Sequence, residues 1–316
     1  MAAAVQTVPI VCTHKLDKQF FDSHTEEMRV PKIFRGVDIG ACTSKWNAGY
    51  LAESLGDAKT TVHVCAEEKL DFITKNFQYK TLEFREYIRR SSRPLGQPLD
   101  DYFIDPHEKY YLRSLGEDVR KDTANIHEQH QQIAKDLILP QVFLEKQFFS
   151  SVLRIASPCS QLWTHYDVMD NILIQVVGSK DILLFPPEDY PYLYMRGDKS
   201  TILDPDNVDP LKYPLYCKTS PYRATLQPGD IIYIPALWFH NVKARDFSVA
   251  VNVFWKNLDA SFYDSRDVYG NKDLMPAARA QQGVDKAIKT LSTLPAQYKH
   301  FFTLKIIAKL QQSLDD

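Results

Sequence analysis

The sequence predicts a mainly β fold, a sandwich or a barrel, with flanking helices and a helical C-terminal segment. Between residues 161 and 255, short runs rich in Ile, Val, Leu and aromatic residues alternate with turn signals such as Gly178, Pro186-Pro187 and Pro228-Gly229-Asp230. Short strands with such punctuated ends are typical of sandwiches and barrels. Beyond Pro276 the apolar residues recur at helical spacing instead, which predicts helices there.

The elements follow in chain order. Residues 1–105 mix helical and strand patterns, with 67–90 partly helical and a loop at 91–98. Residues 106–257 carry the β core. Its predicted strands lie at 161–165, 172–177, 182–185, 231–234 and 247–255. Three parts therefore follow: an N-terminal α/β elaboration at 1–105, the β core at 106–257 and a helical segment at 258–316.

Two segments have more than one interpretation. The loop at 190–222 is long and rich in proline, aspartate and tyrosine; such loops are often functional, so it is either a flap over a substrate or a connector. The C-terminal segment reads as two amphipathic helices, 277–294 and 295–314, joined at Pro295. Their apolar positions include Val284, Ala287, Ile288, Leu291, Phe301, Leu304, Ile307 and Leu310. This stripe either packs on its own domain or joins a second chain.

Composition favours an intracellular enzyme. The chain has 316 residues, 44% hydrophobic and 25% charged, which is ordinary for a globular protein. Its apolar runs are too short for a membrane span, and the first residues lack the pattern of a signal peptide. The five cysteines form no CxxC pair, so reduced thiols in cytoplasm or nucleus are expected.

The motif with the clearest chemistry is His165-Tyr166-Asp167, followed by His240. In a strand, side chains at i and i+2 point to the same face, so His165 and Asp167 project together. Two histidines and one carboxylate occupy one face of an octahedral iron(II) and leave the other face open. The alternative is a chance tripeptide, since the chain has nine histidines.

The predicted strand at 247–255 has two different faces. One face carries large residues from Phe247 to Trp255, and the other carries Ser248, Ala250 and Asn252. A face of small residues leaves room for a ligand, to which Asn252 can bond. A solvent-facing side of an ordinary sheet explains the same pattern equally well.

Together these residues resemble a known family. The order HxD, Lys180, PGD-x4-P-x4-H ending at His240, and Asn252-Val-Phe-Trp is similar to the JmjC branch of the cupin superfamily. Within that branch, residues 109–118, 162–171 and 234–242 are most similar to the tRNA wybutosine hydroxylases. The resemblance implies a double-stranded β-helix (cupin or jelly-roll) and an oxygenase that uses iron(II), 2-oxoglutarate and dioxygen.

The resemblance also implies roles for individual residues. His165, Asp167 and His240 would bind iron, while Lys180 and Tyr111 would bind the far carboxylate of 2-oxoglutarate. Tyr110 is the neighbour with which Tyr111 can be confused. Asn171 and Asn252 match asparagines near the cosubstrate. Where some relatives have a threonine three residues before the first histidine, this chain has Leu162, so the role of that hydroxyl must fall to Tyr111 or another group.

The implied reaction is hydroxylation of the side chain of a wybutosine precursor, a hypermodified guanosine beside the anticodon of phenylalanine tRNA. Two alternatives stay open: a JmjC peptidyl hydroxylase or demethylase acting on protein, and a non-catalytic RNA-binding or dimerisation module. Related small JmjC hydroxylases dimerise through C-terminal helices, which implies a homodimer here.

Charge permits RNA binding only through local patches. The net charge is −2, so no global basic field exists, but a local cluster is enough to bind phosphates. Residues 274–312 hold six basic residues and one acid, among them Lys286 and Lys289. Arg154 lies on the predicted strand before the HxD motif, and a second basic cluster consists of Arg85, Arg89, Arg90 and Arg93. The alternative for each patch is an ordinary solvated surface.

Overall fold

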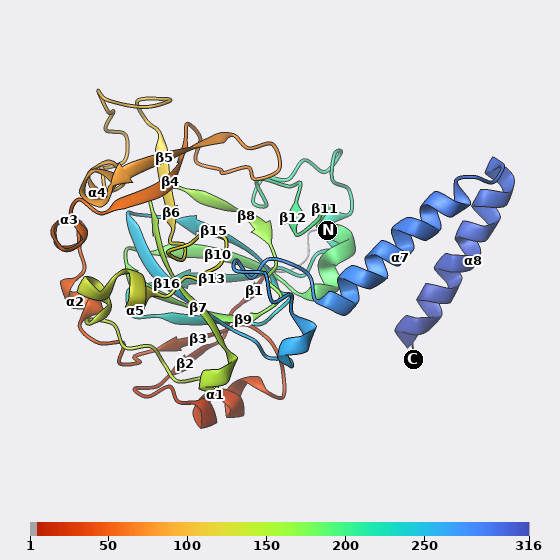
Figure 1. Ribbon diagram of the computed structural model, residues 1–316, viewed down its shortest axis with the longest axis horizontal. Helices are drawn as coiled ribbons and strands as arrows, with labels where there is room; N and C mark the ends of the chain where they lie inside the picture. Colours follow the sequence, from red (N-terminus) through yellow and green to blue (C-terminus); the bar gives the residue numbers. More distant parts are fainter. Residues whose placement is uncertain (1–4, 316) are drawn as a thin grey trace. The chain divides into compact units, whose positions relative to one another are not determined.

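The computed structural model describes residues 5–315 and consists mainly of strands in two sheets (Figure 1). The strands are β1 Gln6–Thr7, β2 Ile10–Cys12, β3 Lys32–Arg35, β4 Lys59–Cys65, β5 Phe77–Glu83, β6 Lys109–Arg113, β7 Phe148–Ala156, β8 Gln161–His165, β9 Asp170–Val177, β10 Lys180–Phe185, β11 Met195–Arg196, β12 Lys199–Ser200, β13 Tyr222–Leu226, β14 Ile231–Ile234, β15 Phe239–Ala244 and β16 Ser248–Trp255. The α-helices are α1 Lys18–Thr25, α2 Cys42–Lys45, α3 Ala48–Leu55, α4 Phe84–Ser91, α5 Ile126–Gln129, α6 Gln131–Ala134, α7 Met275–Leu291 and α8 Ala296–Asp315. The 3-10 helices are η1 Glu145–Gln147, η2 Pro187–Tyr192, η3 Tyr216–Lys218 and η4 Ala260–Phe262.

The two sheets have seven and nine strands. The smaller runs β1-β13-β10-β15-β8-β12-β11, and the larger runs β2-β3-β14-β9-β16-β7-β6-β4-β5. Consecutive strands alternate between the sheets from β7 to β10, as a jelly-roll requires. The predicted mainly β class with flanking helices is therefore confirmed. Strands from both sides of residue 105 share the larger sheet, since β4 pairs with β6.

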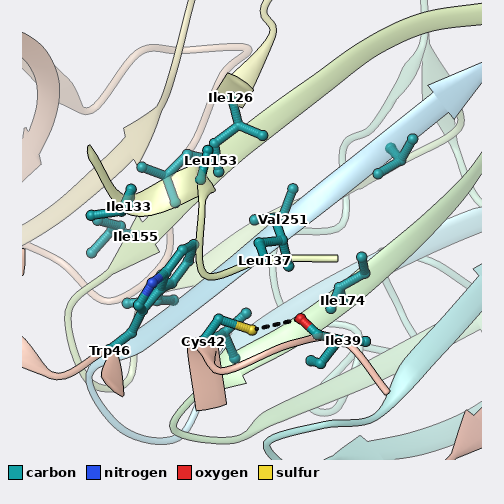
Figure 2. Close-up of a cluster of buried hydrophobic side chains, with 14 of the residues drawn as sticks. Ile39, Cys42, Trp46, Ile126, Ile133, Leu137, Leu153, Ile155, Ile174 and Val251 are labelled. Carbon is teal, nitrogen blue, oxygen red and sulfur yellow. Dashed lines mark hydrogen bonds between the residues drawn. The ribbon is translucent and has the colours of Figure 1, made fainter. Parts of the chain in front are cut away.

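The main core lies on the outer face of the larger sheet. Figure 2 shows Leu153 and Ile155 of β7 and Val251 of β16 packed against Trp46 and Cys42 at α2. Ile126 of α5 and Ile133 of α6 join the same cluster (Figure 2). Burying each such side chain contributes about 1.5–3 kcal/mol. Helices therefore cover one face of this sheet, and its other face stays available for a site.

Gly178 marks the corner at which the chain leaves β9 for β10 in the other sheet. Its φ is +67°, and a Cβ there would meet the Phe247 carbonyl oxygen at 2.3 Å. Both facts exclude a larger residue, because L side chains avoid this backbone region and the partner atom is backbone. The corner brings Lys180, the first residue of β10, back toward the space between the sheets.

Most predicted strands lie where the sequence placed them. The prediction at 161–165 matches β8, while β9 and β10 each begin two residues earlier than predicted. The partly helical segment 67–90 holds α4, but its centre is strand β5. Cross-strand pairing of β5 with β4 along Lys59–Cys65 outweighs local helical preference there.

The chain divides into two compact units. One comprises the chain through Asn257 together with Val268–Asn271, and the other comprises Leu258–Asp267 and the segment from Lys272 onward. In the second unit α7 and α8 contact one another, which confirms the predicted C-terminal helices. Along residues 5–315, each helix is too short or too polar to cross a membrane. All five cysteines are free thiols.

Candidate metal and cosubstrate site

His165 and His240 face each other across a pair of antiparallel strands. They are direct partners in the register of β8 and β15, and their ring centroids are 4.3 Å apart. Asp167 follows β8 by two residues, and its Oδ2 lies 3.6 Å from His240 Nε2. One ligand atom from each of the three residues lies within 4.8 Å of the others. The structure thus brings together the three predicted ligands, a spacing that suits one metal ion.

Backbone hydrogen bonds orient both imidazoles. His165 Nδ1 lies 3.0 Å from the Trp163 carbonyl oxygen, and His240 Nδ1 lies 3.1 Å from that of Trp238. A carbonyl oxygen only accepts, so each Nδ1 carries the proton and each Nε2 keeps a free lone pair. This arrangement is the usual way in which a protein prepares a histidine to bind metal.

Burial keeps both histidines neutral. It lowers the pKa of His165 well below the ordinary value, and the nearby His240 adds to that effect. Burial also lowers the pKa of His240, although Asp167 acts in the opposite direction. Neutral imidazoles do not have to lose a proton before they bind a metal, so the site is ready at neutral pH.

The turn before β15 is held by the segment after β8. The Leu237 amide donates to the Asp167 carbonyl oxygen at 2.8 Å, and Leu237 has a φ of +71°, which is rare for leucine. The buried Asp170 carboxylate accepts from the Ala236 amide at 2.8 Å and from Arg29 at 2.5 Å. These contacts fix Asp167 and His240 relative to one another.

A pocket between the two sheets opens on the triad. Its lining residues come from both sheets: Tyr111, Arg154, Ala156, Ser160, Leu162, His165, Asp167, Leu173, Lys180, Ile234, His240, Val242, Ala244 and Asn252. We call it the inner pocket. Of the small face of β16, Asn252 lines the pocket. Ser248, Ala250 and Asn252 are at most 5% exposed, so the solvent-facing interpretation of that strand is wrong.

Lys180 and Arg154 place two positive charges in this pocket. Lys180 is 5% exposed, and within residues 5–315 its ammonium has no hydrogen-bond or ion-pair partner. Burial, with the nearby Arg154 as a second cause, lowers the pKa of Lys180 to about 7. An unpaired buried ammonium is costly, so this position of Lys180 suits the binding of an anion.

Other polar atoms of the pocket are also unsatisfied. Ser160 Oγ, Arg154 Nε and Asn252 Oδ1 are buried and meet no partner among the described residues. Arg154 Nη1 donates to the Tyr111 hydroxyl. Buried polar groups are normally bonded, so these atoms fit a small polar ligand. The residues present therefore suit a dicarboxylate such as 2-oxoglutarate.

The structure also places the remaining predicted cosubstrate residues. Tyr111 and not Tyr110 lines the inner pocket, because Tyr110 is on the other face of β6 in the main core. Asn171 lies behind Asn252 and does not line the pocket. Its Oδ1 accepts from Asn252 Nδ2 at 3.1 Å. Leu162 lines the pocket as an apolar residue. Ser160, which the sequence did not single out, supplies a hydroxyl there.

A second hollow adjoins the first. It shares Tyr111, Arg154, His165 and Asp167 with the inner pocket, and we call it the outer cleft. Its other lining residues are Thr61, His63, Phe72, Tyr79, Arg113, Leu115, Trp163, Asp198, Lys199, Phe254, Tyr269 and Asn271. Sequence analysis missed these residues, although two-residue spacing places Trp163 with His165 and Arg113 with Tyr111.

The loop at 190–222 reaches this cleft. Its strand β12 pairs with β8, with Lys199 opposite His165, and so brings Asp198 and Lys199 into the wall. Of the two interpretations of the loop, this position favours a substrate-side flap.

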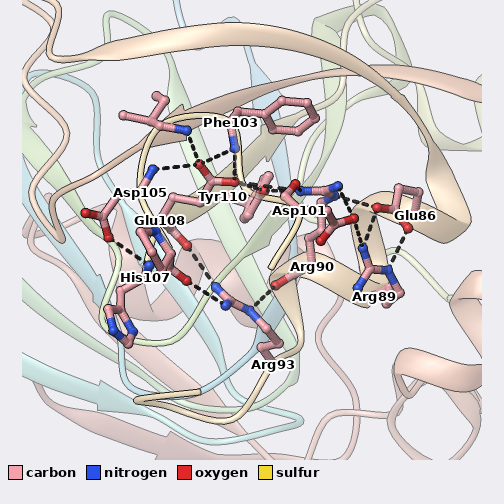
Figure 3. Close-up of polar contacts among 12 residues, drawn as sticks. Glu86, Arg89, Arg90, Arg93, Asp101, Phe103, Asp105, His107, Glu108 and Tyr110 are labelled. Atoms are coloured by element: carbon pink, nitrogen blue, oxygen red, sulfur yellow. Dashed lines mark hydrogen bonds and ion pairs between the residues drawn. The ribbon is translucent and has the colours of Figure 1, made fainter. Parts of the chain in front are cut away.

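The arginines of α4 are engaged in ion pairs (Figure 3). Arg90 is 5% exposed and donates to Glu86 at 2.5 Å and Asp101 at 2.7 Å. Arg89 donates to the same two carboxylates, while Arg93 donates to backbone carbonyls. This network ties α4 to the segment around Asp101 and neutralises part of the positive charge that the sequence suggested.

The C-terminal unit presents both charge and apolar surface. Lys286 and Lys289 of α7 are exposed. So are large apolar side chains of both helices, with exposed fractions of 54% for Ile288, 63% for Phe301 and 44% for Ile307. No residue of α7 is buried.

Comparison with known proteins agrees with this geometry. The cupin-like domain family matches residues 17–261. The chain is 46% identical over 308 residues to the human protein called tRNA wybutosine-synthesizing protein 5, covering 98% of this chain and 97% of the relative. It is 49% identical to the chicken protein of that name, covering 90% and 88%. It is also 37% identical to tRNA wybutosine-synthesizing protein 4 of Gibberella zeae, of which it spans only 27%.

The match to the domain family covers most of the chain, and the similarity to the human and chicken proteins covers nearly all of it. The chain therefore belongs to the cupin-like (JmjC-type) domain family and, within it, to the family of tRNA wybutosine-synthesizing protein 5.

Proposed function

We propose that this protein takes part in wybutosine biosynthesis, as an iron(II)- and 2-oxoglutarate-dependent oxygenase. Its substrate is phenylalanine tRNA that carries a wybutosine precursor, of which it hydroxylates the side chain. The observation that carries this proposal is the His165–Asp167–His240 triad beside a cationic pocket, in a chain similar over 98% of its length to tRNA wybutosine-synthesizing protein 5.

The triad would hold the metal through His165 Nε2, His240 Nε2 and one Asp167 oxygen. Such a ligand set leaves open positions that iron(II) uses for a cosubstrate and dioxygen. When bound, iron(II) and 2-oxoglutarate would supply the chemistry by which dioxygen hydroxylates a C–H bond, with succinate and carbon dioxide as the other products. The protein contributes binding, orientation and exclusion of side reactions.

The inner pocket would hold 2-oxoglutarate at its far carboxylate. Lys180 supplies the charge, and the hydroxyls of Tyr111 and Ser160 supply hydrogen bonds. Asn252, supported from behind by Asn171, would bond nearer the metal. Apolar side chains of Leu162, Leu173, Ile234 and Val242 line the rest, which excludes bulk water from the reacting centre.

We propose that exposed cations outside the triad and its pockets bind the tRNA backbone. Lys286 and Lys289 of α7 and the half-exposed Arg89 supply these charges. Arg90 contributes indirectly, because its buried ion pairs hold α4 in place. Arg154 lines the pocket and would act on substrate or cosubstrate, not on the phosphate backbone.

The test is direct. The protein is incubated with iron(II), 2-oxoglutarate, dioxygen and phenylalanine tRNA that carries the unhydroxylated precursor. The expected result is succinate release and a nucleoside heavier by one oxygen atom. His165→Ala, as the matched control, should give neither. Binding of metal and 2-oxoglutarate with no RNA product would contradict the proposal and direct the search to protein substrates.

We further propose that two copies of the chain associate through α7 and α8. The exposed apolar row on these helices is the supporting observation, together with the dimers of related small JmjC hydroxylases. Ile307→Asp places a charge in this row and is expected to weaken the dimer by at least ~100-fold, because burying an unpaired charge is unfavourable. Sedimentation across a concentration series measures it.

The matched control is Gln312→Asp, which adds the same charge elsewhere on α8. It should leave the association unchanged. A wild-type protein that sediments as a monomer at all concentrations would contradict the proposed dimer.

A further inference from the structure

Aromatic rings form a continuous row from the metal triad to the surface of the outer cleft. The ring centroids of Trp163 and His165 are 4.9 Å apart, and those of Trp163 and Phe72 are 3.6 Å apart. The row continues from Phe72 to His63 at 5.3 Å and from His63 to Tyr79 at 4.7 Å. Tyr79 is 61% exposed, so the row ends at solvent.

The row is assembled from separate parts of the chain. His63 belongs to β4, Tyr79 to β5 and Trp163 to β8, while Phe72 lies on the segment between β4 and β5. Trp163 is partly accessible, whereas the other three of the four tryptophans are at most 5% exposed. A large aromatic surface left accessible beside a catalytic centre marks a binding site for an apolar or planar group.

The charges of the cleft select the kind of planar group. Arg113, Arg154 and Lys199 line it, against the acids Asp167 and Asp198. Asp167 belongs to the triad, and Asp198 accepts both of its contacts from Lys199, at 2.5 and 2.6 Å. Aromatic cages that bind methylated ammonium groups lack such cations, because like charges repel. Lys199 and Asp198 thus offset each other, and Arg113 and Arg154 remain as cations of the cleft. The cleft is suited to a planar base without positive charge and unsuited to a methyl-lysine.

We propose that the outer cleft holds the planar, purine-derived base of the RNA substrate against Trp163 and Tyr79, and so presents the side chain of that base to the triad. The inference rests on the proposed function and names the part of the site that selects the substrate. Base–aromatic stacking tolerates many bases because each has a π-face. An enlarged, tricyclic base offers more area than guanine and gains more from the row of rings.

The test compares binding of two RNAs by the full chain, loaded with manganese(II) so that no turnover occurs. One is phenylalanine tRNA with the tricyclic base, and the other is the same tRNA with unmodified guanosine at that position. Wild-type protein should bind the first at least about tenfold more tightly. Binding should also quench tryptophan fluorescence, since Trp163 is the accessible tryptophan.

Four variants separate stacking from folding. Trp163→Leu should lose most of the tenfold preference, while Trp163→Phe should keep the preference and lose the quenching. Tyr79→Ala removes an exposed ring without disturbing the core and should reduce the preference severalfold. Tyr102→Ala, an exposed ring outside the cleft (48% exposed), is the matched control. Manganese affinity should be the same in all four, which shows that the triad is intact.

Two results would overturn the inference. One is a Trp163→Leu variant and a Tyr79→Ala variant that both keep the full preference for the tricyclic base. The other is tighter binding of a trimethyl-lysine peptide than of either RNA. If wild-type protein forms the hydroxylated nucleoside and these variants bind and turn over like wild type, the cleft inference alone fails. If wild type forms no product and shows no preference, the proposed function fails as well.

Discussion

Replacing Asp167 by alanine is expected to remove metal binding and turnover together. Asp167 supplies the charged oxygen of the triad, and its Oδ2 lies 3.6 Å from His240 Nε2. Replacing a residue that only hydrogen-bonds to a metal ligand already lowers metal affinity or activity by about 10–100-fold. Loss of the carboxylate itself should weaken manganese(II) or iron(II) binding by more than ~100-fold, measured by calorimetry under anaerobic conditions.

The fold should survive this change. The Asp167 side chain makes few contacts beyond the triad, so the free energy of unfolding should change by less than about 1 kcal/mol. Asp198→Ala removes a carboxylate from the outer cleft without touching the triad, and metal affinity should be kept in that variant. An Asp167→Ala protein that binds metal as tightly as wild type would show that the three residues are not the ligand set.

Replacing Lys180 by methionine should change activity and stability in opposite directions. The variant loses the cation proposed for the far carboxylate of 2-oxoglutarate, and removing one partner of a buried charged pair costs several kcal/mol. The KM for 2-oxoglutarate should therefore rise by about 100-fold or more. In the ligand-free protein, an unpaired buried ammonium is replaced by an apolar side chain of similar length, so the free energy of unfolding should increase by about 1–4 kcal/mol.

The pH dependence follows from the same residue. Burial lowers the pKa of Lys180 to about 7 from 10.5, so between these values the unfolded chain holds a proton that the folded chain lacks. Where the unfolded state binds more protons, stability rises with pH; the ligand-free protein should gain stability from pH 7 to about 10. Binding of 2-oxoglutarate should weaken over the same range, since it needs the charged amine.

Both pH effects should be absent from Lys180→Met. Lys243→Met is the matched control, because Lys243 lies on the neighbouring strand β15 with 41% of its side chain exposed, near Glu68. That variant should keep the wild-type KM and the wild-type slope of stability against pH. An unchanged KM in Lys180→Met would place the cosubstrate carboxylate elsewhere.

Sequence reasoning was most reliable where the chemistry is local. The strand at 161–165 was placed correctly because alternation has a period of two residues, and that same period puts His165 and Asp167 on one face. Prediction from the sequence was least reliable at 67–90, where β5 forms by pairing with β4. A local pattern carries no information about a partner strand whose paired residues lie 12 to 24 positions away.

The arginines of α4, and Arg93 just after it, show that the sequence is an equally poor guide to local charge. In the sequence, Arg89, Arg90 and Arg93 form a basic cluster. In the structure, Glu86 and Asp101 accept from Arg89 and Arg90, and backbone carbonyls accept from Arg93. A run of like charge in the sequence does not show which acids face it: Glu86 lies one turn earlier on α4, whereas Asp101 lies on the segment after the helix.

By itself, the sequence determined the β class, the C-terminal helices and the common face of His165 and Asp167, since each rests on spacing along a single element. That His240 meets these two residues was decided by the pairing of β15 with β8. Tertiary structure alone decided which faces meet. It turned Tyr111 and Asn252 inward and left the Ser160 hydroxyl and the Lys180 ammonium without a partner among residues 5–315. It also assembled the row of rings from β4, β5, β8 and the segment between β4 and β5. The physical reason is that periodicity shows which side chains share a face, whereas only packing shows what that face meets.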